Sequence, residues 1–211
     1  MSDPPRGASE LHAAEEIALF PLNTVLFPGG PLEVRIFEPR YLDMIRAALK
    51  SGSEFGVLQI RAGGEVGPAE TVDVGTSARI VDFYQLPGGL LGITCRGARR
   101  FRIASRRQQR DGLNLGMAQW LAEPAQVPVP ARLERLARLV QALLPELGDT
   151  YAGMELRLDD ACWVGYRLSE ILPLRPSERQ RSLELEDPLE RLELIETFSA
   201  SLRERTPDPG A

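Results

Sequence analysis

The sequence is poor in the side chains that most catalytic sites use. Its 211 residues include one histidine, His12, one lysine, Lys50, and two cysteines, Cys95 and Cys162. The other basic residues are arginines, which stay protonated and cannot act as general bases. His12 lies in a polar leader, and Lys50 stands just before Ser51-Gly52 at the end of an expected helix, where a lysine is solvated. We therefore expect neither a Ser-His-Asp triad nor a Ser-Lys dyad, and no catalytic residue.

Several other classes of protein are excluded in the same way. The sequence has no glycine-rich loop ending in Gly-Lys-Ser/Thr, so it lacks the usual phosphate loop. Its cysteines are too few for a zinc site of four thiolates. No apolar run approaches the roughly 18 residues of a membrane helix, and the leader MSDPPRGASELHAAEE has no apolar core. We expect no cofactor, no metal, reduced thiols and a cytoplasmic protein.

The composition is otherwise that of an ordinary globular protein. Hydrophobic residues make up 43% of the chain and charged residues 26%, with a formal net charge of -5. A chain of this length buries roughly 70% of the surface that it exposes when unfolded, so it can form a stable core without disulfides or a structural metal. The negative net charge disfavours general affinity for nucleic acid or for an anionic membrane.

The pattern of residues divides the chain into two parts. We expect a tail over 1–15, a β-rich part over 16–123, a proline-rich linker over 124–130, a helical part over 131–205 and a second tail over 206–211. Short strands are expected at 17–20, 32–36, 55–60, 78–86, 90–96, 101–103 and 117–121, with a hairpin turn at 87–89. Their spacing predicts a small barrel or curled sheet.

Helices are expected in both parts. One interrupts the strands over 38–49, with Pro39 in its first turn and Gly52 as its stop. The helical part begins with an apolar stripe at Leu133, Leu136, Val140, Leu143 and Leu144. Further helices are expected from a cap at Asp159, from Pro176 and from Asp187-Pro188. The sequence therefore predicts an α+β fold, in which a β-rich part with one inserted helix precedes a helical bundle.

One segment has a strong local charge. Seven arginines between residues 96 and 110 occur with no acidic residue among them, and we call them the arginine stripe: Arg96, Arg99, Arg100, Arg102, Arg106, Arg107 and Arg110. Such a stripe suits an acidic peptide or RNA phosphate. It is equally typical of a solvated, partly paired strand in a protein that uses arginine in place of lysine.

Several ordered blocks resemble the Lon N-terminal, or substrate-binding, domain family. The first is Leu19–Tyr41, with its Phe-Pro-Gly turn and Ile-Phe-Glu-Pro-Arg-Tyr at the helix start. Similar blocks follow at 74–80, 92–103 and 169–180, and the resemblance spans about 16–203. It implies a twisted, PUA-like β-barrel packed against a helical bundle. Phe20, Phe27, Phe37 and Tyr41 are expected to anchor one wall of the barrel. Glu38 and Arg40 are expected either to pair with each other or to hold neighbouring backbone.

The resemblance also implies a function. In Lon proteases this region helps to recognise polypeptide substrates. No ATPase module and no serine-lysine protease module follows in these residues, so we expect a free-standing, non-catalytic module and do not carry ATP-dependent proteolysis over. The expected partner is a polypeptide segment or a protein. We expect no interaction with a membrane. The candidate contact residues are Phe27, Pro28, Phe37, Arg99, Arg100 and Arg102.

Two alternatives stay open at this stage. The arginine stripe and the PUA-like barrel also fit an RNA-binding module, although the stripe has no interleaved aromatic residues for base stacking. A hydrolase with an unfamiliar carboxylate site is the third reading, and an activity screen with and without divalent metal would reveal it.

Overall fold

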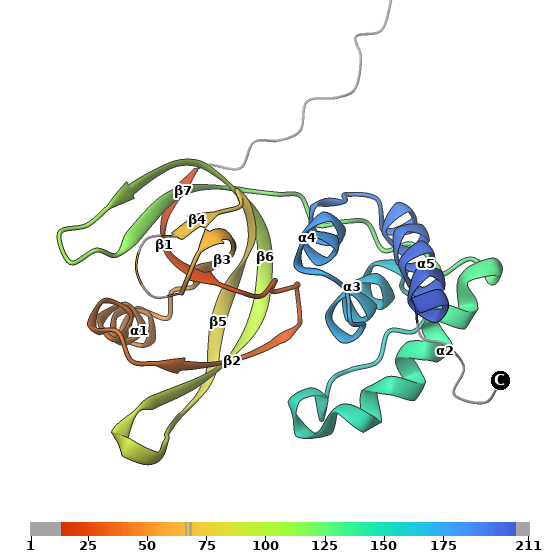
Figure 1. The fold of residues 1–211 in the computed structure, drawn as a ribbon, viewed down its shortest axis with the longest axis horizontal. Helices are drawn as coiled ribbons and strands as arrows, with labels where there is room; N and C mark the ends of the chain where they lie inside the picture. The colour runs from red at the N-terminus through yellow and green to blue at the C-terminus, as the bar shows by residue number, and fades with distance from the viewer. Residues whose placement is uncertain (1–13, 66, 68, 206–211) are drawn as a thin grey trace, which may run out of the picture.

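The computed structural model describes residues 14–205 except 66 and 68. His12 and most of the expected tails lie outside these residues. The β-rich and helical parts stand side by side, and the chain crosses from one to the other after residue 120 (Figure 1). The expected α+β organisation is confirmed, with the strands first and the helices after them.

The β-rich part is a closed barrel. Its ring consists of β1 (Glu15–Leu22), β7 (Asn114–Trp120), β6 (Leu91–Gln108), β5 (Val74–Gln85) and β3 (Phe55–Gly63). Neighbours in this order pair antiparallel, and the ring closes because β1 also pairs with β3 in parallel. Two further strands lie on the ring: β2 (Pro31–Ile36) pairs with β6, and the short β4 (Ala69–Thr71), which the sequence did not indicate, pairs with β3.

The expected strands at 90–96 and 101–103 are one continuous strand, β6. Gly97 lies between the two expected segments. It allows a close approach of the backbone, since a Cβ atom there would lie 2.1 Å from the carbonyl oxygen of Phe27. Register shifts at Thr76/Ala78 in β5 and at Ile103/Ser105 in β6 bend the long strands around the barrel.

Helix α1 (Pro39–Ser51) follows β2 and packs against the barrel core. It begins at Pro39 and stops at Gly52, whose φ of 70° is the left-handed conformation expected of a C-terminal cap. Its apolar face reaches the barrel core, where the ring of Tyr41 lies 4.4 Å from that of Phe20. The ion pair expected as one alternative is present as well, with Arg40 Nη2 at 2.8 Å from Glu38 Oε2.

The helical part packs around a separate apolar core. Its helices are α2 (Glu134–Leu143), α3 (Ala161–Ile171), α4 (Pro176–Glu184) and α5 (Pro188–Arg205), with short 3-10 turns at Ala131–Leu133 (η2) and Leu144–Tyr151 (η3). A further 3-10 turn, Pro87–Gly89 (η1), is the predicted β5–β6 hairpin turn. The bundle core is built from α2, α3 and α5, and includes Leu136, Val140, Val164, Leu168, Leu192 and Ile195.

One helix start differs from the prediction. Asp160, not Asp159, caps α3, because its Oδ1 accepts a hydrogen bond of 2.9 Å from the N–H of Cys162. Backbone hydrogen bonds with the linker fix the segment at which α3 begins. The N–H of Val129 donates to the carbonyl oxygen of Asp159, and the N–H of Ala161 donates to that of Val127. Of the helices in the described part of the chain, none is long and apolar enough to cross a membrane.

Candidate functional site

The barrel and the bundle share a small apolar core. Phe27 from the loop after β1 lies at its centre, fully buried, with its ring 5.7 Å from that of Tyr166 on α3. Val25, Val74, Cys162 and Leu183 complete this cluster. The side chain of Phe27, one of the predicted contact residues, is therefore inaccessible to a partner and holds the two parts together.

Buried arginines lie beside this shared core, and we call the whole contact between the barrel and the bundle the joint. Arg100 on β6 is 3% exposed and donates to the carbonyl oxygens of Leu183 and Leu185, at 2.9 and 3.0 Å, and to that of Ala122 at 3.3 Å. Arg191 on α5 is also buried, and it donates to the carbonyl oxygens of Ser182 and Leu185. The carbonyls of Ser182, Leu183 and Leu185 lie at the C-terminal end of α4, where a helix leaves acceptors unpaired and carries partial negative charge. Arg100 therefore has a structural role, and it is not part of an exposed surface.

The rest of the arginine stripe is largely engaged. Arg106 pairs with Asp73 and Arg107 with Glu16, each at 2.6 Å. The guanidinium of Arg99 lies 3.8 Å from the ring centre of Trp120, in a stacked arrangement. Arg102 is exposed. The stripe is thus a partly paired strand surface.

A different surface exposes large apolar side chains. We call it the hairpin surface, and it lies on the β5–β6 hairpin and the end of β2: Phe37 (54% exposed), Val81 (52%), Phe83 (59%), Tyr84 (37%) and Leu90 (41%). The hairpin projects beyond the barrel, away from its junction with the linker (Figure 1). Phe37, predicted both as a barrel anchor and as a contact residue, is therefore not an anchor, because its side chain is more than half exposed.

The strand register explains why these side chains are exposed. Phe83 pairs with Ile93, which pairs with Val34, so these three side chains lie on one face of the sheet. Ile93 is fully buried in the barrel core, whereas Phe83 at the margin is not covered. Ile36 pairs with Leu91, which places the following Phe37 next to Leu90. The apolar inner face of the barrel thus continues outward along the hairpin.

The edge of β2 lies beside this surface. Among the described residues, β2 pairs with β6 and with no other strand. The N–H of Gly97 donates to the carbonyl oxygen of Gly30 at 2.9 Å, which fixes the alternation of the antiparallel ladder. By that alternation, the main-chain groups of Glu33 and Arg35 point away from β6. Both residues are exposed, so this edge offers donors and acceptors to an added strand.

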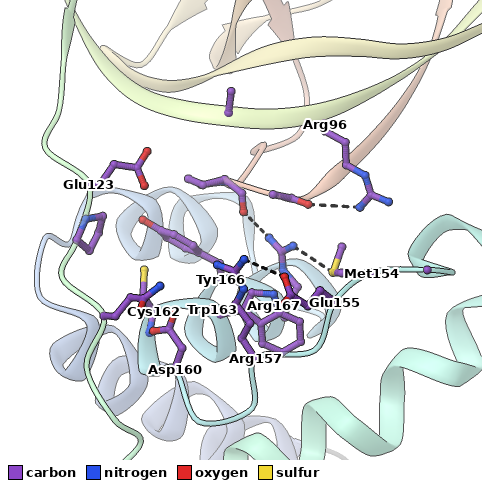
Figure 2. A pocket seen from close by; sticks show the side chains of 16 residues that line it. Arg96, Glu123, Met154, Glu155, Arg157, Asp160, Cys162, Trp163, Tyr166 and Arg167 are labelled. Carbon is purple, nitrogen blue, oxygen red and sulfur yellow. Dashed lines mark hydrogen bonds and ion pairs between the residues drawn. The ribbon is translucent and has the colours of Figure 1, made fainter.

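A cleft of about 520 Å³ lies between the barrel and α3 (Figure 2). Pro28 and Arg96 line it on the barrel side, and Trp163, Tyr166 and Arg167 line it on α3. Pro28, another predicted contact residue, is half-buried here.

Burial changes the titration of groups at this joint. Glu170 on α3 lies directly behind Arg167, which donates to its Oε1 at 3.0 Å. Removal of this carboxyl from water raises its pKa to about 7, against the opposing effect of the Arg167 charge. Burial likewise raises the pKa of the Tyr166 hydroxyl to about 12. Within the described residues, no group of three or more His, Cys, Asp or Glu side chains is arranged to hold a metal ion.

Comparison with known proteins identifies the fold. The sequence matches the family described as the ATP-dependent protease La (LON) substrate-binding domain over residues 16–198. The chain belongs to this family. Lon protease 2 of Myxococcus xanthus is 25% identical over 200 residues, which cover 91% of this chain and 24% of that protein. A Lon protease of Porphyromonas gingivalis is 31% identical over 97 residues, 44% of this chain and 12% of that protein. The chain thus spans less than a quarter of the length of these curated relatives.

Solved structures agree with this assignment to the LON substrate-binding domain family. A Lon N-terminal domain protein from Xanthomonas campestris is 35% identical with a TM-score of 0.74, over 87% of this chain and 98% of that one. The N-terminal domain of the Mycobacterium avium complex Lon protease is 16% identical with a TM-score of 0.64, over 88% of this chain and 98% of that one. The second likeness concerns the fold alone. The predicted family and α+β fold are confirmed.

Proposed function

We propose that this protein binds non-native polypeptide segments on the hairpin surface and holds them, or presents them to a partner protein as an adaptor, without itself cleaving them. The observation that carries the proposal is the group of four large apolar side chains exposed on one projecting hairpin, with the exposed Phe37 at the end of β2 beside them. Exposed apolar groups of this kind mark interaction sites in soluble proteins. Membership of a substrate-binding domain family supports a polypeptide as the partner.

The hairpin surface and the edge of β2 recognise different parts of a polypeptide. The hairpin surface favours apolar side chains of any shape, because apolar burial is not directional. The edge of β2 favours an extended main chain, since the outward groups of Glu33 and Arg35 bond to backbone irrespective of sequence. Together they select exposed, extended, apolar segments, which folded proteins do not present.

The size of the surface sets the expected affinity. Burying the exposed half of each apolar side chain contributes on the order of 1 kcal/mol. The loss of translational and rotational freedom offsets much of the sum. We therefore expect weak, reversible binding, with a dissociation constant on the order of 10 μM or higher. Such binding suits a module that must release its polypeptide.

A titration tests the proposal. A fluorescently labelled model protein, reduced and blocked with the uncharged reagent iodoacetamide so that it stays unfolded, is titrated with the full chain and followed by anisotropy. Phe83→Ser is the test variant. Leu156→Ser is the matched control, because Leu156 is 51% exposed and belongs to the connection between η3 and α3.

The expected result is saturable binding that Phe83→Ser weakens by about fivefold or more, while Leu156→Ser changes it by less than about twofold. Added salt should weaken this binding far less than RNA binding, which would fall steeply with salt. Absence of saturable binding, or equal losses in the two variants, would overturn the proposal.

A further inference from the structure

Arg167 is a buried cation whose donors are only partly satisfied. Its side chain is 1% exposed. Nη2 donates to the carbonyl oxygen of Pro28 at 2.7 Å and to Glu170, but Nη1 donates only to the thioether sulfur of Met154, at 3.5 Å. Nε is buried and has no hydrogen-bond partner. A thioether is a weak acceptor, and an unsatisfied buried donor of a charged group is costly. Nη2 therefore has oxygen partners, whereas Nη1 has only the sulfur of Met154.

The surroundings of Arg167 are rich in positive charge. Arg96 lies on the opposite wall of the cleft, and its Nη1 reaches the carbonyl oxygen of Gly29 at 3.4 Å. Figure 2 shows Arg96, Arg167 and Met154 gathered at one end of the cleft and Glu123 at the other. This end therefore holds the guanidinium groups of Arg96 and Arg167, with the carboxyl of Glu170 bonded to Arg167 and that of Glu155 paired with Arg157.

Two other carboxylates that line the cleft are already engaged. Glu155 pairs with Arg157 at 2.9 Å, and Asp160 caps α3. Both Arg167 and Met154 line the cleft, so a ligand oxygen that displaced the flexible Met154 side chain would reach Nη1. A volume of about 520 Å³ accommodates a few residues of a peptide, and Trp163 and Tyr166 provide an apolar wall.

We propose that this cleft binds a carboxylate of the bound polypeptide, either its C-terminus or an Asp or Glu side chain, between Arg96 and Arg167. The inference rests on the proposed function, because it assumes a polypeptide ligand. It adds a second, charge-selective contact to the apolar contact at the hairpin surface. A guanidinium–carboxylate contact is among the stronger hydrogen bonds in proteins and supplies the oxygen acceptor that Nη1 of Arg167 lacks.

The test uses labelled peptides of repeated Ser-Val-Ser-Phe units, about a dozen residues long, titrated against the full chain. One peptide has a free C-terminal carboxylate and one is amidated. Two further amidated peptides carry an internal Glu or an internal Gln at the same position. Arg96→Gln is the test variant, since this side chain lines the cleft and is half-buried, whereas Arg167 is fully buried. Arg102→Gln is the matched control, an exposed arginine on the same strand.

At least one carboxylate peptide should bind about tenfold more tightly than its neutral counterpart. Arg96→Gln should abolish most of that preference, and Arg102→Gln should keep it. Whichever pair shows the preference identifies the source of the carboxylate. Equal binding of all peptides, with the loss in Phe83→Ser retained, would overturn this inference and leave the proposed function standing. No binding of any peptide would overturn both.

Discussion

Replacement of Arg100 by methionine tests the role of the joint in stability. Methionine keeps much of the aliphatic stem but removes the donors that reach three carbonyl oxygens, on Leu183, Leu185 and Ala122. A hydrogen bond to a charged group contributes about 1.5–3 kcal/mol, and carbonyls left without a partner add a penalty. Because methionine is uncharged, the variant no longer bears the cost of burying a guanidinium charge, and this offsets part of the loss. We expect a net destabilisation of about 2–4 kcal/mol.

Urea denaturation of the full chain measures this effect. Circular dichroism reports the helices, and tryptophan fluorescence reports both parts, because Trp120 lies in β7 and Trp163 in α3. Arg102→Met is the control, since Arg102 is exposed on the same strand and should change stability by less than about 0.5 kcal/mol. If Arg100→Met were as stable as this control, the buried arginine would not hold the joint, and the argument from α4 carbonyls would be refuted.

Two further predictions concern buried titratable groups. Because the pKa of Glu170 is raised from 4.5 to about 7, the folded state binds its proton more tightly than the unfolded state does. The stability of the wild type relative to Glu170→Gln should therefore fall as pH rises from about 4.5 to about 7, by up to about 1.4 kcal/mol per pH unit; urea melts across this range showing a constant or rising difference would contradict it. Burial raises the pKa of the Cys95 thiol to about 12, so Cys95 should resist Ellman's reagent at pH 8 until the protein is unfolded. Rapid labelling of Cys95 in the native protein, detected by mass spectrometry, would disprove its burial.

The parts of the fold that local rules govern were predictable. Pro39, Pro176 and Pro188 each begin a helix, as expected of proline in a first turn. Pro87-Gly88-Gly89 makes the predicted hairpin turn. These residues act through their own backbone geometry, so their neighbours in sequence suffice to predict them.

The candidate site was harder to predict, because its residues depend on distant partners. Arg100 is buried by carbonyls more than 80 residues away in sequence, and nothing near it distinguishes it from the exposed Arg102. Phe27 and Phe37 flank the same strand and look alike in the sequence, yet one enters the joint and the other lies on the hairpin surface. The one local signal of that surface is the run of apolar residues on both faces of β5, which includes Val81, Phe83 and Tyr84.

Hydrogen exchange followed by mass spectrometry tests the account most directly, since it locates the bound polypeptide on the full chain. Exchange is compared with and without a saturating concentration of the unfolded model protein. The account predicts slower exchange over residues 33–37 and 80–93, where the edge of β2 and the hairpin surface lie. Unchanged exchange in these segments, with protection confined to the helices, would contradict it.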